Sequence, residues 1–434
     1  MLHRIKRFVP SRALLAYHFA LSLLATLIFR FPARKMIVIG VTGTNGKSST
    51  VQLTGQLLMA LGHSVGWTST DSWRVKDRVT TNDKKMTMLG RFQTQKLLNE
   101  MVRAGCTHAV VETSSQGVAQ FRHVGIAYDV MVLTNLAPTH IEAHGGFENY
   151  KAAKLKAFQT LAGKPGGVSV INVNDAFAAE FAAVGVERVV GFGRSDQRVF
   201  DVLTDERFLA DEVEITKTGS RFSLQGVTFS TPLIGAFSLH NTLCAIAVAA
   251  SLGARLEALQ RPVSALTPIP GRLETFQKGG VTVVVDYAPE PHSLKALYEV
   301  VALFDPARII HVTGSAGGGR DVAARAQVGT LAALHDDVVI VTNEDPYDDD
   351  PMEIIDDVAD GAVAHGKRDG VDLFRILDRR EAIGKAISLS KMGDMVLVTG
   401  KGSEPVMVVA GGRKIPSDDR VFVKEALSLM QDNV

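Results

Sequence analysis

The sequence predicts an α/β protein with mostly parallel sheets, on three observations. Short runs rich in β-branched residues alternate with helical patterns from Met36 onward, which is typical of βαβ units. The segment Pro268-Ile269-Pro270-Gly271 interrupts this periodicity, and a second series of the same kind follows it. The chain has 434 residues, enough for two or three domains of roughly 100–200 residues each. We therefore expect domains at 36–268 and 269–434, preceded by an apolar helical segment at 1–35.

The expected elements follow in chain order. A strand at Met36–Val41 leads through a glycine-rich turn to a helix at Lys47–Leu61. Helices are then expected at Lys96–Ala104, Tyr150–Leu161 and His240–Leu252, and strands at His108–Val111 and Tyr128–Leu133. Between Val168 and Leu233, short runs separated by Gly and Ser turns predict antiparallel strands at a sheet edge. Strands of the second domain are expected at Val281–Tyr287, Arg308–Thr313, Asp337–Thr342, Leu373–Leu377 and Asp394–Thr399.

The composition is that of an ordinary globular protein. Lys and Arg together number 47 and Asp and Glu 46, a formal net charge of +1, so no overall field favours nucleic acid as a partner. Two cysteines, Cys106 and Cys244, are too few for a disulfide framework or a zinc site. A cytoplasmic enzyme with local clusters of charge fits these counts better than a DNA-binding protein does.

The N-terminus is less ordinary, because the run Ala13–Phe29 is apolar and has basic residues on both sides. Its 17 residues lie at the lower limit for crossing a bilayer. A signal peptide is not expected, since Phe31–Lys35 is a poor cleavage site and a strand follows at once. Three interpretations stay open: a helix packed on the protein or a partner, an interfacial helix in peripheral contact with the inner membrane face, or a true span.

The segment from Val38 to Ser49 reads V-I-G-V-T-G-T-N-G-K-S-S and predicts a phosphate-binding loop. Glycines let the backbone curl around an anion, and the helix N-terminus that follows adds its dipole. Lys47 is placed to reach the β- and γ-phosphates and Ser48 to bind Mg²⁺. The generic Walker pattern is missed by one position, because Val41 stands where a glycine is expected five residues before Gly46.

Further candidates carry weaker signals when taken alone. Glu112 ends a predicted strand, and the carboxyl end of a parallel strand is the ligand edge of such a sheet, so this acid can hold a metal near the phosphates or simply face solvent. His140 can equally be a loop residue, Lys154 a lysine on a helix surface, and Asn241 a helix N-cap.

The spelling T-G-T-N-G-K-S at residues 42–48 resembles the ATP loop of the Mur ligase and folylpolyglutamate synthase superfamily. The resemblance extends over nearly the whole chain from about Met36, through T-N-L-A-P-T-H-I-E-A-H-G at 134–145, Y-K-A-A-K at 150–154 and G-R-L-E at 271–274. It is closest to the branch of muramyl-tripeptide synthetases. It implies a central P-loop ATPase domain, a Rossmann-like C-terminal ligase domain and the cofactors ATP and Mg²⁺. It also implies a ligase that activates a carboxylate acceptor, here a muropeptide, as an acyl phosphate and joins an amino acid to it, as the third residue of a peptidoglycan stem peptide.

The resemblance also implies roles for individual residues. Lys47, Glu112, His140 and Lys154 are the implied catalytic residues, with Lys154 carbamylated by CO₂ so that it joins Ser48, Glu112 and His140 around Mg²⁺. The implied nucleotide-binding residues are Gly43, Thr44, Asn45, Gly46, Lys47, Ser48, Ser49, Asn241, Arg272 and Asp286. Those implied for the acceptor and amino acid are Thr80, Thr81, Ser114, Ser115, Arg122, Arg320, Asp345, Tyr347, Gly400 and Glu404, and Thr113 is expected to line the acceptor site beside the two serines. Carbamylation needs a neutral amine, so Lys154 requires a lowered pKa.

Several positions depart from the family pattern. Thr139, Glu142, Ser238, Pro289 and Ser403 replace its Asp, Asp, Asn, His and His. Tyr347 stands where the branch that uses meso-diaminopimelate has an arginine gripping a carboxylate, which favours lysine or another basic amino acid here. The family's N-terminal uridine-binding domain does not fit before Gly40. A folylpolyglutamate- or cyanophycin-type ligase, and a nucleotide-dependent binding protein that has lost catalysis, are the alternatives.

Overall fold

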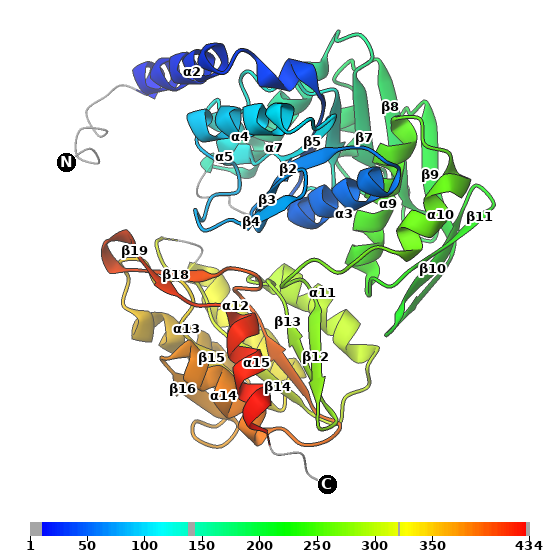
Figure 1. Cartoon of the computed structure of the whole chain (residues 1–434). Coiled ribbons are helices and arrows are strands. Elements are labelled where there is room, and N and C mark those ends of the chain that lie inside the picture. Colours follow the sequence, from blue (N-terminus) through cyan, green and yellow to red (C-terminus); the bar gives the residue numbers. More distant parts are fainter. Residues whose placement is uncertain (1–10, 138–143, 320–321, 431–434) are drawn as a thin grey trace. The chain divides into compact units, whose positions relative to one another are not determined.

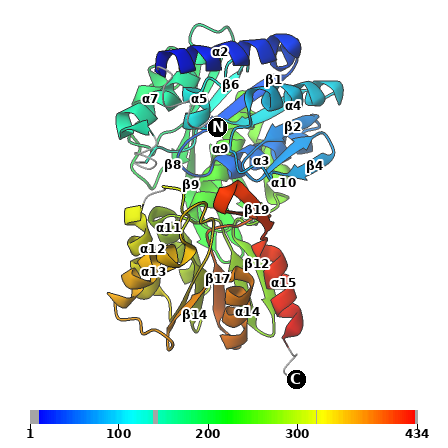
Figure 2. The same cartoon turned by 90° about the vertical axis from the view of Figure 1, so that its left-hand side faces the viewer.

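The structure is a computed structural model that describes residues 11–137, 144–319 and 322–430. Its contacts divide the chain into two compact units. Unit 1 comprises Met1–Ile215, Gly219–Leu233 and Phe237–Leu266, and unit 2 comprises Thr216–Thr218, Ile234–Ala236 and Thr267–Val434. Each unit has its own sheet (Figures 1 and 2). The expected α/β class is thus confirmed, and the exact domain bounds at residues 35/36 and 268/269 stay predictions.

Unit 1 is built on an eleven-stranded sheet in the order β11-β10-β9-β8-β7-β6-β1-β5-β2-β3-β4. Its strands are β1 (Ile37–Thr42), β2 (Val65–Thr68), β3 (Ser72–Val75), β4 (Arg78–Thr81), β5 (His108–Glu112), β6 (Val130–Leu133), β7 (Val168–Asn172), β8 (Arg188–Arg194), β9 (Glu206–Thr216), β10 (Gly219–Leu224) and β11 (Val227–Thr231). Strands β1, β5 and β6 are buried along most of their length, which matches their unbroken apolar runs and a position in the middle of a parallel sheet.

Helices cover both faces of this sheet. They are α2 (Ser11–Ile28), η1 (Pro32–Lys35), α3 (Lys47–Ala60), α4 (Arg91–Arg103), α5 (Ser115–Ala119), α7 (Phe147–Phe158), η2 (Gln159–Leu161), α8 (Ala178–Ala182), α9 (Ala236–Ser251) and α10 (Leu256–Ser264). Helices α4, α5 and α7 lie on one side, and α3, α9 and α10 on the other (Figures 1 and 2). Leu98, Met101 and Phe158 from the first group pack into the main core with Tyr128 and Met131.

The strand order positions the candidate site. Strand β1 lies between β5 and β6 and pairs in parallel with both, so the chain crosses over β1 on its way from β5 to β6. The carboxyl ends of neighbouring parallel strands meet at one edge of the sheet, where α/β proteins bind ligands. The loops that follow Thr42, Glu112 and Leu133 therefore converge there.

The expectation for Val168–Leu233 is only partly met. Strands β7, β8 and β9 pair in parallel, and the antiparallel pairing with neighbours in sequence is seen for the β10–β11 hairpin. The five-residue helix α8 at Ala178–Ala182 supplies the crossover between β7 and β8. So short a helix does not produce a recognisable helical period, and without it the pattern predicts antiparallel strands.

The apolar N-terminal run forms helix α2, which contacts α4 at the outer edge of unit 1 (Figure 1). None of the helices in the described residues is long and apolar enough to cross a membrane. The interpretation as a true span is therefore wrong for this helix. The other two interpretations are still open after the fold is known.

Unit 2 is a three-layer α/β unit with the sheet order β12-β13-β17-β14-β15-β16. Its strands are β12 (Glu274–Lys278), β13 (Val281–Val285), β14 (Ile309–Thr313), β15 (Val338–Thr342), β16 (Leu373–Ile376) and β17 (Met395–Val398), with a separate hairpin of β18 (Val406–Val409) and β19 (Arg413–Pro416). Its helices are α11 (Pro291–Ala302), α12 (Val322–His335), α13 (Pro351–Val363), α14 (Arg379–Leu389), η3 (Ala410–Gly412) and α15 (Asp419–Leu429). All five strands expected from sequence are present.

Helices α11, α12 and α13 pack on one face of this sheet and α14 and α15 on the other. Gly329 and Gly361 allow α12 and α13 to touch backbone to backbone, because a Cβ on either would overlap a carbonyl of the other helix. A buried ion pair joins α14 to α15 in the second layer, where Arg379 Nε and Nη2 donate to the Asp419 carboxylate at 2.7 and 2.8 Å. These layers fix the carboxyl ends of β14, β15 and β17 at one edge.

Candidate functional site

The phosphate loop of unit 1 connects β1 to α3. Gly46 is the N-cap of α3 with φ +78°, a left-handed conformation that glycine adopts without steric cost. A Cβ at Gly43 would overlap the Thr134 hydroxyl. Both glycines are therefore required by geometry, one by its backbone angle and one by close approach.

The loop is anchored to the segment that follows β6. The Thr44 amide donates to the Asn135 carbonyl at 2.9 Å, and the Asn45 amide donates to the Asn135 side-chain oxygen at 2.9 Å. Thr134 Oγ1 and Asn135 Nδ2 in turn donate to the Asn45 carbonyl. Lys47 Nζ donates to the Thr44 carbonyl at 2.8 Å, so the lysine lies directly over the loop.

Ser48 and Glu112 lie together at the start of α3 and the end of β5. Ser48 Oγ donates to Glu112 Oε2 at 2.8 Å, and Thr70 donates to the same carboxylate from its amide (2.7 Å) and hydroxyl (3.0 Å). Burial raises the pKa of Glu112, Lys47 nearby lowers it, and Asp71 raises it further. A buried carboxylate beside a serine hydroxyl is an oxygen donor set of the kind that Mg²⁺ prefers, with phosphates completing the shell.

Lys154 is buried beneath the phosphate loop. Its Nζ donates to the Gly43 carbonyl at 2.6 Å and lies 4.5 Å from the Tyr150 ring centroid. Burial, with the charge of Lys47 as the second cause, lowers the pKa of Lys154 well below its usual value. The neutral amine that carbamylation requires is therefore favoured at this position. Its causes, burial and the nearby charge of Lys47, come from the fold and are not visible in the sequence.

Two further residues were expected near this centre, His140 and Asn241. His140 belongs to 138–143, as do Thr139 and Glu142, and lies outside the described residues. Asn241 is not an N-cap, because α9 begins five residues earlier at Ala236. Its side-chain oxygen accepts from Thr50 Oγ1 at 3.2 Å, and a Cβ at Gly46 would overlap it. Asn241 thus lies against the loop, next to the turn of α3 that carries Ser49.

The residues expected to bind the acceptor are more dispersed. Ser114 caps α5 by accepting from the Gly117 amide, and Ser115 Oγ lies 3.1 Å from His144 Nε2. Arg122 donates to the Met88 carbonyl and the Gln120 side chain. Thr113, which was also expected to line the acceptor site, is fully buried, and its hydroxyl lies 2.9 Å from the Tyr128 hydroxyl. Thr80 and Thr81 lie on β4 at the far end of the sheet order.

Unit 2 positions its candidate residues at the ends of its own strands. Asp286 follows β13 and accepts from the Leu273 and Ala288 amides at 2.8 and 2.9 Å. The Arg272 guanidinium lies 4.2 Å from the centroid of the Tyr287 ring. Arg320, expected in the glycine-rich turn after β14, is outside the described residues together with Asp321.

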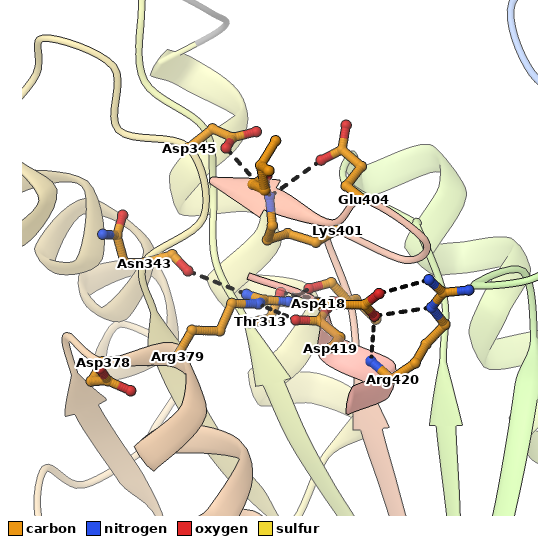
Figure 3. A network of polar contacts seen from close by, with 12 residues as sticks. Thr313, Asn343, Asp345, Asp378, Arg379, Lys401, Glu404, Asp418, Asp419 and Arg420 are labelled. Atoms are coloured by element: carbon orange, nitrogen blue, oxygen red, sulfur yellow. Dashed lines mark hydrogen bonds and ion pairs between the residues drawn. The ribbon is translucent and has the colours of Figure 1, made fainter. Parts of the chain in front are cut away.

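Lys401 is the centre of a polar network in unit 2 (Figure 3). Its fully buried ammonium group lies 3.3 Å from Asp345 Oδ1 and 3.3 Å from Glu404 Oε2, and donates to the Val406 carbonyl at 2.9 Å. Asp345 also accepts from the Val408 amide. Asp345 and Glu404, both implied for substrate binding, therefore share the ammonium group of Lys401 in this structure, a contact that the sequence does not reveal.

Glu344 was expected from the sequence only to add, with Asp345 and Asp348, to a negative local field that favours a distal ammonium group. It is buried, and its Oε2 has no hydrogen-bond partner among the described residues. Gly400 has φ +105°, and a Cβ there would overlap this oxygen. Burial and, next, the charge of Asp345 raise the pKa of Glu344 to about 7. The side chain of Tyr347, on the same loop, lies against Gly318.

Several further residues of these networks had no role expected from the sequence. Thr70 and Asn135 hold Glu112 and the loop through contacts between distant segments, which leave no local pattern. The two Asp-Arg pairs at 378–379 and 419–420 resemble the family pattern only weakly. Asp378 and Asp418 cap α14 and α15, and Arg379 donates to Asp419 and to the Thr399 carbonyl at 2.6 Å.

Comparison with known proteins agrees with this geometry. Residues 41–249 match the family model described as Mur ligase middle domain, and residues 271–402 match the model described as Mur ligase, glutamate ligase domain. The chain is 33% identical to a UDP-N-acetylmuramyl-tripeptide synthetase from Roseiflexus sp. (strain RS-1), over 97% of this chain and 84% of the relative. It is 35% identical to a UDP-N-acetylmuramoyl-L-alanyl-D-glutamate–2,6-diaminopimelate ligase from Gloeobacter violaceus, over 93% and 80%. A solved structure of a ligase with that second name superposes with TM-score 0.60 and 28% identity, over 91% of this chain and 78% of the other.

The buried carboxyl of Glu344 predicts a pH-dependent stability. Its pKa is raised from 4.5 in the unfolded chain to about 7, so the folded state binds more protons between these values and loses stability as pH rises through them. The cost is on the order of 3 kcal/mol above pH 7. Glu344→Gln should therefore unfold at higher urea than the wild type at pH 8, and the advantage should disappear at pH 4.5.

The matched control is Glu353→Gln, an exposed glutamate in the next helix, which should change neither midpoint. An equal effect of Glu344→Gln at both pH values would contradict the assignment of Glu344 as a buried carboxyl that is costly to ionise.

Proposed function

Because the chain belongs to the Mur ligase family, whose members are ATP-dependent, ADP-forming ligases, we propose that it joins an amino acid to a muropeptide carboxylate as the third residue of a peptidoglycan stem peptide. The observation that carries the proposal is Lys154, a buried amine with a lowered pKa that contacts the phosphate loop. A lysine is costly to bury with its charge, so an uncharged or modified amine is expected there.

The proposed chemistry has two steps. An oxygen of the acceptor carboxylate attacks the γ-phosphorus of ATP, and ADP leaves, which gives an acyl phosphate. The amine of the amino acid then attacks the acyl carbon, phosphate leaves with that oxygen, and the nitrogen loses a proton to form the amide. The protein contributes mainly position and charge. Lys47 and the loop at Gly43–Gly46 would hold the phosphates that are transferred.

The residues for a magnesium site are Ser48, Glu112 and Lys154, with His140 from the family pattern. When bound, Mg²⁺ would neutralise phosphate charge during transfer. CO₂ would add to the neutral Lys154 amine, giving a carbamate and releasing one proton. That change converts a neutral amine into an anion close to Glu112, and so suits a divalent cation better than the unmodified lysine does.

The acceptor and the amino acid would be held by separate groups. Ser115 and Arg122 on the segment after β5 present a hydroxyl and a guanidinium, which suit a carboxylate-bearing peptide. In unit 2, Asp345, Glu404 and Glu344 form an acidic set at the ends of β15 and β17, with Lys401 as its cation. This set supports an incoming amino acid with an additional ammonium group.

The direct test is a matrix of acceptors and amino acids with the purified protein. Muropeptide acceptors, folate and a cyanophycin-like peptide are each combined with single amino acids, and ADP release and the product mass are measured. ADP release that requires both a muropeptide and an amino acid, with an amide product, is expected. Release that requires folate instead would replace the proposal, and nucleotide binding with no amide product would mean a binding protein.

Lys154→Ala should reduce ligation by at least roughly 100-fold, since it removes an anion beside the transferred phosphate. Short carboxylic acids such as acetate should restore part of the activity, because they can occupy the space of the carbamate. Wild-type activity should also fall when bicarbonate and CO₂ are removed. Lys47→Ala should abolish ATP turnover without rescue.

Lys156→Ala is the matched control, because this exposed lysine is on the same helix and its loss should leave turnover unchanged. Turnover of Lys154→Ala at the wild-type level would refute the carbamate assignment while leaving the ligase proposal to the matrix experiment.

The acidic set predicts that lysine is preferred over meso-diaminopimelate. Tyr347 offers no cation for a distal carboxylate, and a charge-assisted contact is worth on the order of 1.5–3 kcal/mol, a preference of roughly 10–100-fold. Both amino acids are supplied at equal concentration and the products are separated by mass. Tyr347→Arg is the informative variant, since it should shift the mixture towards diaminopimelate; a wild-type mixture dominated by diaminopimelate refutes the prediction.

A further inference from the structure

Most of the large apolar side chains of helix α2 point away from unit 1. A helix that only packs on its own protein would bury these side chains instead. The residues turned towards unit 1 and buried are small or polar, namely Ser22, Ala25 and Thr26. The outer face carries Leu15, Tyr17, Leu23, Leu24, Leu27 and Ile28, each between 41% and 58% exposed. An exposed apolar stripe of this extent marks an interaction surface on a soluble protein.

The helix is nevertheless firmly attached to unit 1. Arg91 Nε donates to the His18 carbonyl at 3.0 Å, and the Phe19 and Phe121 rings meet edge to face at 5.7 Å. Thr26 fits against Gly125, where a Cβ would overlap it. The polar side chains of the inner face bond within the helix, Ser22 Oγ to the His18 carbonyl and Thr26 Oγ1 to the Ser22 carbonyl. The outward display of leucines is therefore fixed by specific contacts.

The charges around this helix indicate which kind of partner its outer face contacts. Residues 1–35 contain seven basic residues, and the first acidic residue of the chain is Asp71. In the described part, Arg30, Arg34 and Lys35 are exposed just beyond the C-terminus of α2. A second copy of the chain would bring like charges together, which opposes self-association. An apolar face flanked by cations is the pattern of helices that lie in the interface of a bilayer with anionic lipids.

We propose that α2 docks the protein on an anionic membrane surface, with the outer face of the helix inserted among the lipid headgroups and Arg30, Arg34 and Lys35 contacting lipid phosphates. The helix lies in the interface and does not cross the bilayer. It also packs on Phe121, next to Arg122, so docking would hold the segment after β5 close to the membrane. The docking itself does not depend on the proposed ligase activity.

The test is vesicle flotation of the full chain. Vesicles of phosphatidylcholine with about one third phosphatidylglycerol are compared with phosphatidylcholine alone, at low and high salt. The wild type should float with the anionic vesicles and lose this binding at high salt. Leu24→Glu/Leu27→Glu should lower the partition coefficient by more than roughly tenfold. Arg30→Glu/Lys35→Glu should remove most of the preference for anionic vesicles.

Leu203→Glu/Leu334→Glu is the matched control, because these leucines are 90% and 63% exposed and distant in sequence from α2, and it should float as the wild type does. Thermal unfolding of every variant is compared, so that loss of fold is recognised. A wild type that binds neither vesicle, or a Leu24→Glu/Leu27→Glu variant that floats normally, overturns the proposal. A dimer in solution that dissociates on Leu24→Glu/Leu27→Glu would instead assign the face to self-association and also overturns it.

Discussion

The burial of the Lys154 amine against the Gly43 carbonyl is the interaction on which the rest of unit 1 depends. It joins α7 to the phosphate loop at 2.6 Å and leaves a basic group where water cannot solvate its charge. The loop must therefore be rigid, which Asn135 and Thr134 ensure from the end of β6. Glu112, at the end of β5, lies near enough to stabilise positive charge on the lysines of the site. Its own pKa is raised because the carboxylate is buried.

Unit 2 also buries charged groups at the ligand edge of its sheet, but it uses different residues. The acids at the ends of β15 and β17 share one lysine, Lys401, while Glu344 has an oxygen with no hydrogen-bond partner within the part of the chain that the structure describes. Buried charges that are incompletely compensated reduce stability. Their concentration at the carboxyl ends of parallel strands, the usual ligand edge, is what a binding site requires and what packing alone would not produce. The Arg379–Asp419 pair beneath them supplies the rigid base.

The sequence predicted the features that rest on local pattern. The phosphate loop, the central strands and the five strands of the second series all follow from glycine spacing and β-branched runs. Contacts between distant segments were not predictable, which is why Thr70, Asn135 and the Lys401 network went unnoticed. The parallel direction of β7 to β9 was hidden by the shortness of α8. The outward face of α2 also required the structure, because an apolar run of this kind does not indicate which side is buried. Sequence analysis stated that Lys154 needs a lowered pKa, and only the fold supplies the burial and the neighbouring Lys47 that cause it.

In the proposed reaction, a carboxylate is activated by transfer of the γ-phosphoryl group of ATP onto one of its own oxygens. Transfer of oxygen-18 from the acceptor tests it most directly. The acceptor carboxylate is labelled with oxygen-18, the enzyme turns over with ATP and the preferred amino acid, and the released phosphate is analysed by mass spectrometry or by the isotope shift of its phosphorus resonance. If an acyl phosphate forms, each phosphate released with amide product should carry one labelled oxygen. Unlabelled phosphate accompanying amide formation would contradict it, because the carboxylate oxygen would then never have been bonded to phosphorus.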